Sequence, residues 1–412
     1  MRKTLLILAL LSSYVFGYAQ ELAGTWKGEL DVMGSKLGLL FHISKEGDKP
    51  VCKMEVPAQG VKDFPIEIRH LSSDSLSLAA PMLTIEYTGK LVGEMIKGTF
   101  KQSGMTIPLD LSRGDAPKVK RPQTPQPPFE YETKEVTFAN PKANATFSGT
   151  LTYPVGYAPN KDVPVVLLVS GSGAQNRDEE IFEHKPFLIL ADHLARHGVA
   201  SLRYDDRGIG LSTGRFEGAT TIDFADDANA GLDFLRGLGE FGKVGVLGHS
   251  EGASIGFILG NRQVTDFVIS MAGPGVKGED ILMDQMKSVK KRSNPSAPEL
   301  TPQEVEEFKK KTKDQPWLSY FMSYDPSADI AGTAVPVMAI NGSLDIQVRA
   351  DMNIEAIRKL LKPNPKNVVK VYEGLNHLFQ NCTTGQLEEY YTIEETMSPE
   401  VMNDISMWIK SL

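Results

Sequence analysis

Residues 243–261, KVGVLGHSEGASIGFILGN, join an apolar run to a stretch rich in small residues. The run at 243–247 predicts a buried strand, and the stretch at 253–261 predicts a helix. Between them lies GHSEG at 248–252, which has the pattern Gly-x-Ser-x-Gly. Glycines on both sides allow a sharp turn that would hold Ser250 clear of the sheet, facing a base and free backbone amides. The stretch therefore predicts a strand-turn-helix unit, with Ser250 as a candidate nucleophile.

Strands and helices alternate along residues 129–412. The runs that predict strands are 135–138, 146–153, 163–169, 200–204, 244–247, 266–271, 337–340 and 368–372. The segments that predict helices are 186–196, 222–235, the stretch after Ser250, 351–361 and a terminal helix from Ser398. Such alternation is typical of a mostly parallel sheet covered by helices on both faces. We therefore predict an α/β fold for residues 129–412.

This alternation is interrupted between residues 275 and 331. The insert is rich in lysine and contains several prolines. Thr301-Pro302-Gln303-Glu304 is a capping box with proline at the first helical position, which predicts a helix from Pro302 toward Lys313. We interpret the insert as a small helical lid over the site. The alternative is a surface excursion that does not touch substrate.

The chain before residue 114 has a different pattern. Residues 20–113 contain short alternating runs separated by turn signals, which predicts a small all-β barrel or sandwich. Its stretch Gly24-Thr25-Trp26-Lys27-Gly28 resembles the opening strand of lipocalin-like barrels, so Trp26 would either line a site for an apolar ligand or fill the core. Residues 114–128 contain five prolines and predict a semi-rigid linker.

Residues 1–19 have the three regions of a secretory signal peptide: Arg2 and Lys3, an apolar run from Leu5 to Leu11, and small residues up to Ala19. The apolar run is too short to span a bilayer, and no cysteine follows it to carry a lipid. We therefore expect export to the periplasm or the medium, without a membrane anchor.

The composition is that of a soluble globular protein, with 41% hydrophobic and 23% charged residues among 412. The formal net charge is −8, and removal of residues 1–19 with their two positive charges would make it −10. This acidic balance argues against a nucleic-acid partner. The two cysteines, Cys52 and Cys382, exclude a disulfide framework but leave open one bridge between domains or two unpaired thiols.

A serine nucleophile needs an imidazole base and a carboxylate that orients the imidazole, in the chain order Ser, Asp or Glu, His. Asp345 follows the predicted strand at 337–340, and His377 follows the strand at 368–372. Both would face the sheet edge that carries Ser250. We predict Asp345 as the orienting acid and His377 as the base. Asp325 and Asp329 precede the relevant strand and are weaker candidates for the acid.

The chain has seven histidines, so His377 has rivals. Five of them are poor candidates, because they lie in the first domain, in or at the end of a helix, or on the pentapeptide itself; they are His42, His70, His193, His197 and His249. His184 is the serious rival, since it lies in a loop that could line the pocket.

Two backbone amides should stabilise the oxyanion of the reaction. The first belongs to Glu251, the residue after the nucleophile. The second should come from Ser170-Gly171-Ser172-Gly173, after the strand at 163–169, where we favour Ser172 over Gly173. A plain flexible turn is the alternative for this loop. A phosphate-binding loop is disfavoured because the Lys-Ser/Thr pair is missing, and the chemistry requires no metal or cofactor.

These residues resemble the α/β-hydrolase superfamily, and within it secreted bacterial EstD-type carboxylesterases and related serine aminopeptidase-like hydrolases. The matching pieces span residue 163 to the C-terminus; they are 169–173, 204–212 (YDDRGIGLS), 248–252, Asp345 and Asn376-His377. The resemblance implies a hydrolase fold with a β-rich N-terminal domain. It also implies that Arg207 supports the site, for which a surface salt bridge is the alternative. Ser170 departs from the pattern, because many relatives have histidine there.

We therefore expect a serine hydrolase that cleaves carboxylic esters, with short-chain acyl esters favoured. A serine peptidase or aminopeptidase with the same triad is one alternative. An exported binding protein with an inert hydrolase domain is the other. The expected partner is a small-molecule ester or a short peptide; acyl specificity and oligomeric state stay open.

Overall fold

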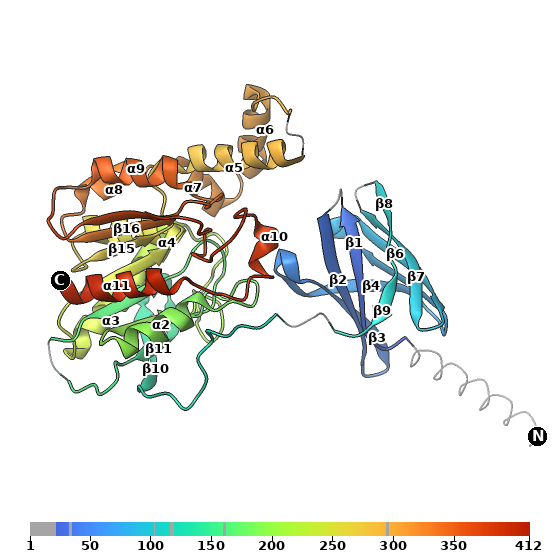
Figure 1. Ribbon diagram of the computed structural model, residues 1–412, viewed down its shortest axis with the longest axis horizontal. Coiled ribbons are helices and arrows are strands. Elements are labelled where there is room, and N and C mark those ends of the chain that lie inside the picture. The colour runs from blue at the N-terminus through green and yellow to red at the C-terminus, as the bar shows by residue number, and fades with distance from the viewer. Residues whose placement is uncertain (1–21, 33–34, 103, 116–118, 160–161, 294–295) are drawn as a thin grey trace, which may run out of the picture. The chain divides into compact units, whose positions relative to one another are not determined.

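The computed structural model describes residues 22–32, 35–102, 104–115, 119–159, 162–293 and 296–412 (Figure 1). The predicted signal peptide at 1–19 lies outside the described residues. Contacts divide the chain into two units, residues 1–120 with 390–392 and residues 121–389 with 393–412. The first is called the barrel unit below, and the second the sheet unit.

The barrel unit is a closed antiparallel barrel. Its described strands are β1 (Gly24–Val32), β2 (Ser35–Glu46), β3 (Lys49–Val56), β4 (Val61–Leu71), β5 (Ser75–Ala80), β6 (Ile85–Val92), β7 (Met95–Gln102), β8 (Met105–Pro108) and β9 (Leu111–Arg113), with short 3-10 turns η1 (Pro57–Gln59) and η2 (Pro81–Leu83). They pair in the order β6-β5-β4-β3-β2-β1-β9-β7, and pairing of β7 with β6 closes the ring. Closure leaves β8 as an extension beside β7. The predicted all-β barrel is therefore confirmed.

Large apolar side chains fill the interior of this barrel. Trp26, Phe41 and Tyr87 are all fully buried in one cluster. The indole N–H of Trp26 donates to the Leu22 carbonyl at 2.9 Å, and the Tyr87 hydroxyl donates to the Leu109 carbonyl at 3.2 Å. Buried polar groups with partners are stable in a core. Trp26 is thus a core residue of the barrel.

The sheet unit contains, within its described residues, one eight-stranded sheet. Its strands are β10 (Thr133–Asn140), β11 (Ala145–Thr152), β12 (Val165–Val169), β13 (Ala200–Tyr204), β14 (Val244–His249), β15 (Val268–Met271), β16 (Val337–Gly342) and β17 (Val368–Tyr372), with a 3-10 turn η3 (Pro141–Ala143) between the first two. They pair in the order β10-β11-β13-β12-β14-β15-β16-β17. β11 pairs antiparallel with both β10 and β13, and all pairs from β13 to β17 are parallel. The carboxyl ends of β14, β16 and β17 therefore meet at one edge.

Helices cover both faces of this sheet (Figure 1). The helices of the described chain are α2 (Pro186–Arg196), α3 (Thr221–Leu238), α4 (Glu251–Asn261), α5 (Gly278–Ser293), α6 (Pro302–Thr312), α7 (Pro316–Ser323), α8 (Ser327–Gly332), α9 (Ala350–Leu360), α10 (Leu387–Tyr390) and α11 (Pro399–Ser411). Apolar residues of α3, α4 and α9 form one buried layer with the sheet, and those of α2 and α11 form the other. The expected α/β fold with both faces covered is confirmed.

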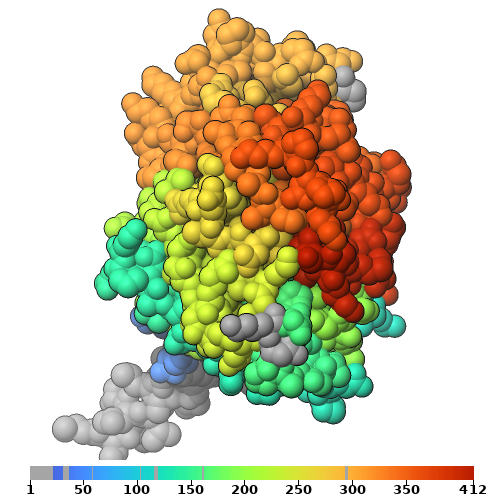
Figure 2. Space-filling model, turned by 90° about the vertical axis from the view of Figure 1, so that its left-hand side faces the viewer, coloured from blue at the N-terminus to red at the C-terminus, as the bar shows by residue number. Residues whose placement is uncertain are grey.

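The insert carries the helices α5, α6 and α7, which lie at the upper edge of the face in Figure 2. α6 begins where the capping box predicts it: the Thr301 hydroxyl accepts the Glu304 amide at 3.2 Å, and a Glu304 carboxylate oxygen accepts the Thr301 amide at 2.7 Å. α8 lies closer to the sheet, because Ile330 is fully buried in the core layer of α3 and α4.

The second half of the proline-rich segment is bound to the sheet unit. The Arg121 guanidinium donates to the carbonyls of Phe182 and Ile393, at 2.9 and 3.1 Å. The Gln123 carboxamide oxygen accepts the amides of Thr396 and Met397, at 2.6 and 3.1 Å. These bonds hold residues from 121 onward on the unit in which Arg121 is counted. Among the described residues, no helix is both long and apolar enough to cross a membrane.

Candidate active site

Ser250 lies on a strained turn between β14 and α4. Its backbone angles are φ 53° and ψ −118°, a region that non-glycine residues seldom occupy. The glycines on either side are required by close packing. A Cβ on Gly248 would lie 1.9 Å from the Gly252 carbonyl oxygen, and one on Gly252 would lie 2.2 Å from the Val169 carbonyl oxygen. The pentapeptide thus adopts the turn of a nucleophile elbow.

Asp345 and His377 are in direct contact. They lie in the loops after β16 and β17, which are neighbouring parallel strands. Oδ2 of Asp345 lies 2.7 Å from Nδ1 of His377, and both side chains are buried. The second oxygen, Oδ1, accepts the backbone amides of Gln347 and Val348 at 2.8 and 2.9 Å. The carboxylate is therefore fixed on one side and bonded to the imidazole on the other.

His249 connects the elbow to the loop of His377. Its Nε2 lies 2.9 Å from the His377 carbonyl oxygen, and the centroids of the two rings are 4.7 Å apart. His377 is thus placed beside the residue that precedes Ser250. Within the described part of the chain, no hydrogen bond joins the Ser250 hydroxyl to His377. Such bonds are often long without substrate and shorten when it binds.

The His249 imidazole is flanked by two acceptors. Nδ1 lies 2.9 Å from the Glu179 carboxylate, and Nε2 faces the His377 carbonyl. An imidazole donates at both nitrogens only when it is protonated. Burial alone would lower the pKa of His249, but the charge and hydrogen bond of Glu179 and the bond to the carbonyl raise it above the ordinary value. We infer a buried imidazolium paired with Glu179.

The predicted oxyanion loop lies against the elbow. A Cβ on Gly171 would lie 3.2 Å from Ser250 Cβ. The Gly171 amide donates at 2.7 Å to the same Glu179 oxygen that binds His249. Ser172 and Gly173 follow and are exposed, with Gly173 at φ +98°. Glu251, the source of the other predicted amide, is the first residue of α4 and is buried.

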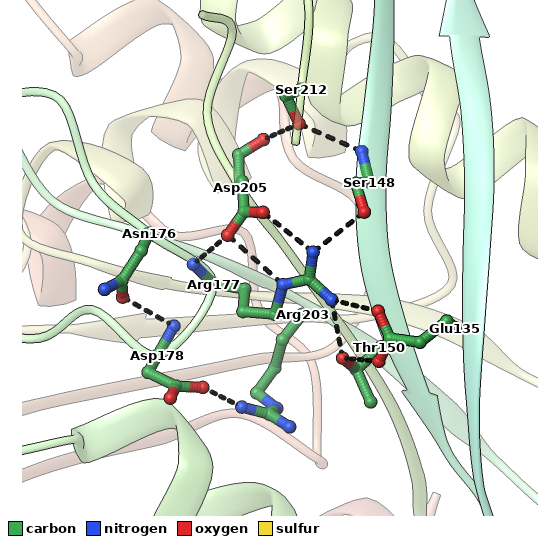
Figure 3. Close-up of polar contacts among 9 residues, drawn as sticks. All are labelled: Glu135, Ser148, Thr150, Asn176, Arg177, Asp178, Arg203, Asp205 and Ser212. Carbon is green, nitrogen blue, oxygen red and sulfur yellow. Dashed lines mark hydrogen bonds and ion pairs between the residues drawn. The ribbon is translucent and has the colours of Figure 1, made fainter. Parts of the chain in front are cut away.

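Arg177 anchors the loop that begins at Ser170 (Figure 3). Its guanidinium binds the Asp205 carboxylate at 2.7 and 3.2 Å and the Glu135 carboxylate at 2.5 Å. It also donates to the hydroxyls of Ser148 and Thr150, each at 2.8 Å. Arg177 therefore joins the loop to β10, β11 and the loop after β13. Burial opposes ionisation of Asp205, but the bonds from Arg177 keep the pKa of that carboxyl below its usual range.

Asp206, beside this network, binds the same loop at Ser170 and Gln175. Its carboxylate accepts the Gln175 amide at 2.9 Å and the Ser170 hydroxyl at 3.3 Å. Burial raises the pKa of Asp206 to about 7, although these two bonds oppose the shift. The loop is thus tied to the segment after β13 through two successive aspartates.

Arg207 forms a buried ion pair with Asp227 of α3. Nε of Arg207 lies 2.6 Å from Oδ2 of Asp227, and the two side chains are 9% and 3% exposed. The Asn140 side-chain amide binds the other oxygen of Asp227 at 2.8 Å. The pair is therefore internal and not a surface salt bridge. It joins the loop after β13 to α3.

The rival base His184 is fully buried in a separate cluster. Nδ1 lies 2.7 Å from the Thr396 hydroxyl, and Nε2 lies 2.9 Å from the Gln380 side-chain nitrogen. Both ring nitrogens are thus engaged, so His184 is not free to act as a general base.

Several site residues were not identified from the sequence. They are Glu179, Arg177, Thr221 and Trp317, each at least 29 positions from Ser250. Thr221 and Trp317 both donate to the Glu251 carboxylate. No motif marks these residues, because loops, the start of α3 and one insert helix bring them to the site. His249 was set aside as the neighbour of the nucleophile. The sequence offered one indication of its role, which is that a titratable residue stands inside the pentapeptide, next to Ser250.

A separate groove lies away from these residues. It has a volume of about 830 Å³ and lies between the β10 end and α3, with Phe138, Lys142, Asp233 and Arg262 in its lining. Its lining includes none of the candidate catalytic residues. Cys52 and Cys382 are both free thiols. In the described part of the chain, no group of three or more His, Cys, Asp or Glu side chains could hold a metal ion.

Parts of the chain are similar in amino-acid sequence to known proteins. Residues 184–361 match the family model described as serine aminopeptidase, S33. Esterase EstD of Thermotoga maritima is 27% identical over 291 residues, which cover 68% of each chain.

Two solved structures illustrate the structural similarities. An esterase of Pyrococcus furiosus is 16% identical, with a TM-score of 0.47, over 72% of this chain and 97% of that one. Est1E from Butyrivibrio proteoclasticus is 13% identical, with a TM-score of 0.44, over 68% of this chain and 99% of that one. With the mixed sheet, the elbow and the family match together, the chain is a serine hydrolase of the α/β-hydrolase superfamily, preceded by an N-terminal β-barrel.

Proposed function

We propose that the protein hydrolyses carboxylic esters, with short acyl groups preferred, through Ser250, His377 and Asp345. The observation that supports this most is the buried contact of 2.7 Å between His377 Nδ1 and Asp345 Oδ2, beside the strained turn at Ser250. In the proposed mechanism, the Nδ1 proton of His377 stays in the hydrogen bond with Asp345. Nε2 of His377 is then the basic nitrogen, as the reaction requires.

The proposed reaction has two halves. Ser250 Oγ attacks the ester carbonyl carbon while His377 Nε2 takes the hydroxyl proton. The tetrahedral oxyanion collapses, the alcohol leaves with that proton, and an acyl-enzyme remains. Water then attacks the acyl-enzyme by the same steps, which release the acid and restore Ser250. Asp345 stabilises the imidazolium that forms in each half.

The oxyanion would be held by the backbone amides of Glu251 and Ser172. The Gly171 amide already donates to Glu179 at 2.7 Å, which favours the next amide in the loop. Glu251 begins α4, so its amide points out of the helix at the end that carries partial positive charge. Donors held in advance stabilise the transition state without reorganisation.

The test is covalent labelling with turnover. A fluorophosphonate should modify Ser250, and Ser250→Ala should be unlabelled and lose roughly 10⁵- to 10⁶-fold in kcat on p-nitrophenyl acetate. Ser254→Ala is the control, because that buried hydroxyl in α4 has no hydrogen-bond partner among the described residues. A wild-type protein that is neither labelled nor active would indicate an inert binding protein.

Peptide hydrolysis is the second candidate, because the matching family model is described as a serine aminopeptidase. The same triad serves amides, but an amine leaves only when it is protonated. Turnover of acyl p-nitrophenyl esters should exceed turnover of aminoacyl p-nitroanilides. The reverse ranking would replace the ester proposal by the peptidase.

We also propose that the protein is exported. The proposal rests on the signal-peptide pattern of residues 1–19. Sequencing the N-terminus of protein recovered outside the cytoplasm should show a chain that begins near residue 20. Recovery of the chain only in the cytoplasm, with residues 1–19 intact, would contradict export.

A further inference from the structure

The buried Glu251 carboxylate is the centre of a cluster of hydrogen bonds. Its Oε1 accepts the Thr221 hydroxyl at 2.6 Å, and its two oxygens accept the indole N–H of Trp317 at 2.8 and 2.9 Å. The Ser172 hydroxyl is a further donor to it. The Glu251 residue is only 2% exposed.

The donors come from three distant parts of the sheet unit. Ser172 lies in the loop after β12, Thr221 begins α3, and Trp317 lies in α7 of the insert. Glu251 itself follows Ser250. The carboxylate therefore connects the two residues whose amides we assign to the oxyanion hole, and it connects both of them to the insert.

A carboxylate bound by neutral donors is an unusual group at a buried position. All three donors are neutral, and a carboxylate that is buried without a cation is unfavourable. Burial accordingly raises the pKa of Glu251, and the bonds from Thr221, Trp317 and Ser172 only partly offset it. An apolar residue at the start of α4 would be buried at a lower free-energy cost. What the carboxylate adds is a set of hydrogen bonds that holds its three donors in place.

We propose that Trp317 is a positioning residue for the oxyanion hole, which acts through the Glu251 carboxylate to set the separation of the Glu251 and Ser172 amides. The proposal rests on the proposed ester hydrolysis and adds a role for the insert. α7 then completes the site instead of only covering it. Trp317 need not touch substrate for this role.

The expected signature is a loss of kcat without a loss of substrate binding. The oxyanion exists only after Ser250 attacks, so displaced amides raise the energy of the transition state and leave the bound ester unaffected. A remote change that shifts a site by about 1 Å can lower the rate by roughly 100-fold. We expect a fall of about 10- to 100-fold in kcat, with KM within about twofold of the wild type.

Trp317→Phe is the direct test, because it keeps an aromatic ring and removes the indole N–H. Trp408→Phe is the matched control. The Trp408 indole N–H, in α11, also donates a part-buried hydrogen bond, to the Lys366 carbonyl at 2.7 Å. The Trp317 variant should lose kcat and the Trp408 variant should not. Equal kcat values for the two variants would overturn the proposal. A rise in KM at unchanged kcat would assign Trp317 to substrate binding and would overturn it too.

Thr221 provides a second test that does not alter the insert. Thr221→Val removes the hydroxyl donor, and Thr221→Ser keeps it. We expect Thr221→Ser to retain at least about fivefold more kcat than Thr221→Val, because only the serine can donate to Glu251. Equal kcat for the two would contradict a role for this cluster, even if Trp317→Phe fails to fold.

The two proposals fail in different ways. Loss of the proposed function would appear in the wild type, as absent turnover of p-nitrophenyl acetate and absent labelling by fluorophosphonate. Failure of the positioning role would appear only in the variants, with an active and labelled wild type. Labelling each variant to completion also shows that Ser250 is still present in folded protein.

Discussion

In the proposed mechanism, Asp345 decides which nitrogen of His377 carries a proton. Its Oδ2 lies 2.7 Å from Nδ1, so the carboxylate would keep the proton there and leave Nε2 basic. The two amides that bind Oδ1 hold this geometry. An asparagine at 345 has the same shape, but its amide could donate to Nδ1 and stabilise the tautomer protonated on Nε2.

Asp345→Asn should therefore lower kcat by about 10⁴-fold while the protein stays folded. Asp325→Asn is the control, because Asp325 is an exposed carboxylate whose hydrogen-bond partner is Ser327, at the start of α8 and away from His377. Stopped-flow or steady-state turnover of p-nitrophenyl acetate measures both. An Asp345 variant within tenfold of the wild type would rule out the proposed orienting role.

His249 should make stability depend on pH. Burial lowers the pKa of His249, but the Glu179 carboxylate more than offsets this effect, so the pKa is raised in the folded protein. The folded state therefore keeps a proton that the unfolded state loses above about pH 6.5. The stabilisation is complete below that pH and disappears as pH rises through the folded pKa. The free energy of unfolding should therefore fall as pH rises above about 6.5.

Urea midpoints of the wild type and His249→Gln, measured from pH 6 to pH 9, test this. Glutamine cannot carry the proton, so its midpoint should change less with pH over this window. If the difference between the two proteins is the same at every pH, His249 is not the titrating group.

At the level of elements, the turn from β14 to α4 depends on two glycines and the backbone that packs on them. A methyl group at 252 would meet the Val169 carbonyl oxygen at 2.2 Å, so the loop after β12 or the start of α4 must move. Both segments belong to the candidate site. The turn therefore links stability to function at this position.

Gly252→Ala should destabilise the protein by about 3 kcal/mol and reduce kcat. Gly237→Ala is the matched change in α3, where a Cβ would meet no atom within 4 Å. It should be neutral or stabilise by up to about 1 kcal/mol, because alanine favours the helix. Thermal unfolding compares the two; similar shifts in Tm would contradict the packing argument.

At the level of the whole molecule, the described candidate catalytic residues all belong to the sheet unit. The barrel unit has its own core around Trp26 and Leu78. A loss of packing in the barrel core should therefore lower the stability of that unit without changing the chemistry. This expectation treats the two units as separate cooperative units.

Leu78→Ala and Leu232→Ala are a matched pair, since each leucine is fully buried in the core of one unit. Each should cost about 2–5 kcal/mol in the unit that contains it. Only Leu232→Ala should lower the temperature at which esterase activity is lost. Calorimetry with activity measured after each heating step tests this, and loss of activity in parallel for both variants would show that the units unfold together.

Local sequence determined the elements that carry strong periodicity or a cap. α2 was predicted with the observed bounds Pro186–Arg196, β17 with Val368–Tyr372, and α6 with its start at Pro302. The elbow was predicted as well, because its glycines, its strand and its helix are adjacent in the chain. The order of Ser250, Asp345 and His377 was also visible, since each follows a predicted strand.

Only the tertiary structure decided what surrounds these residues. Glu179, Trp317 and Thr221 lie in loops or at element ends, where polar residues have no periodicity that would distinguish a buried partner from a solvated one. Trp317 reaches Glu251 across 66 positions, because α7 folds back onto the start of α4. Hydrogen-bond partners of this kind are set by packing between distant segments of the folded chain. Local sequence patterns do not show which distant segments pack together.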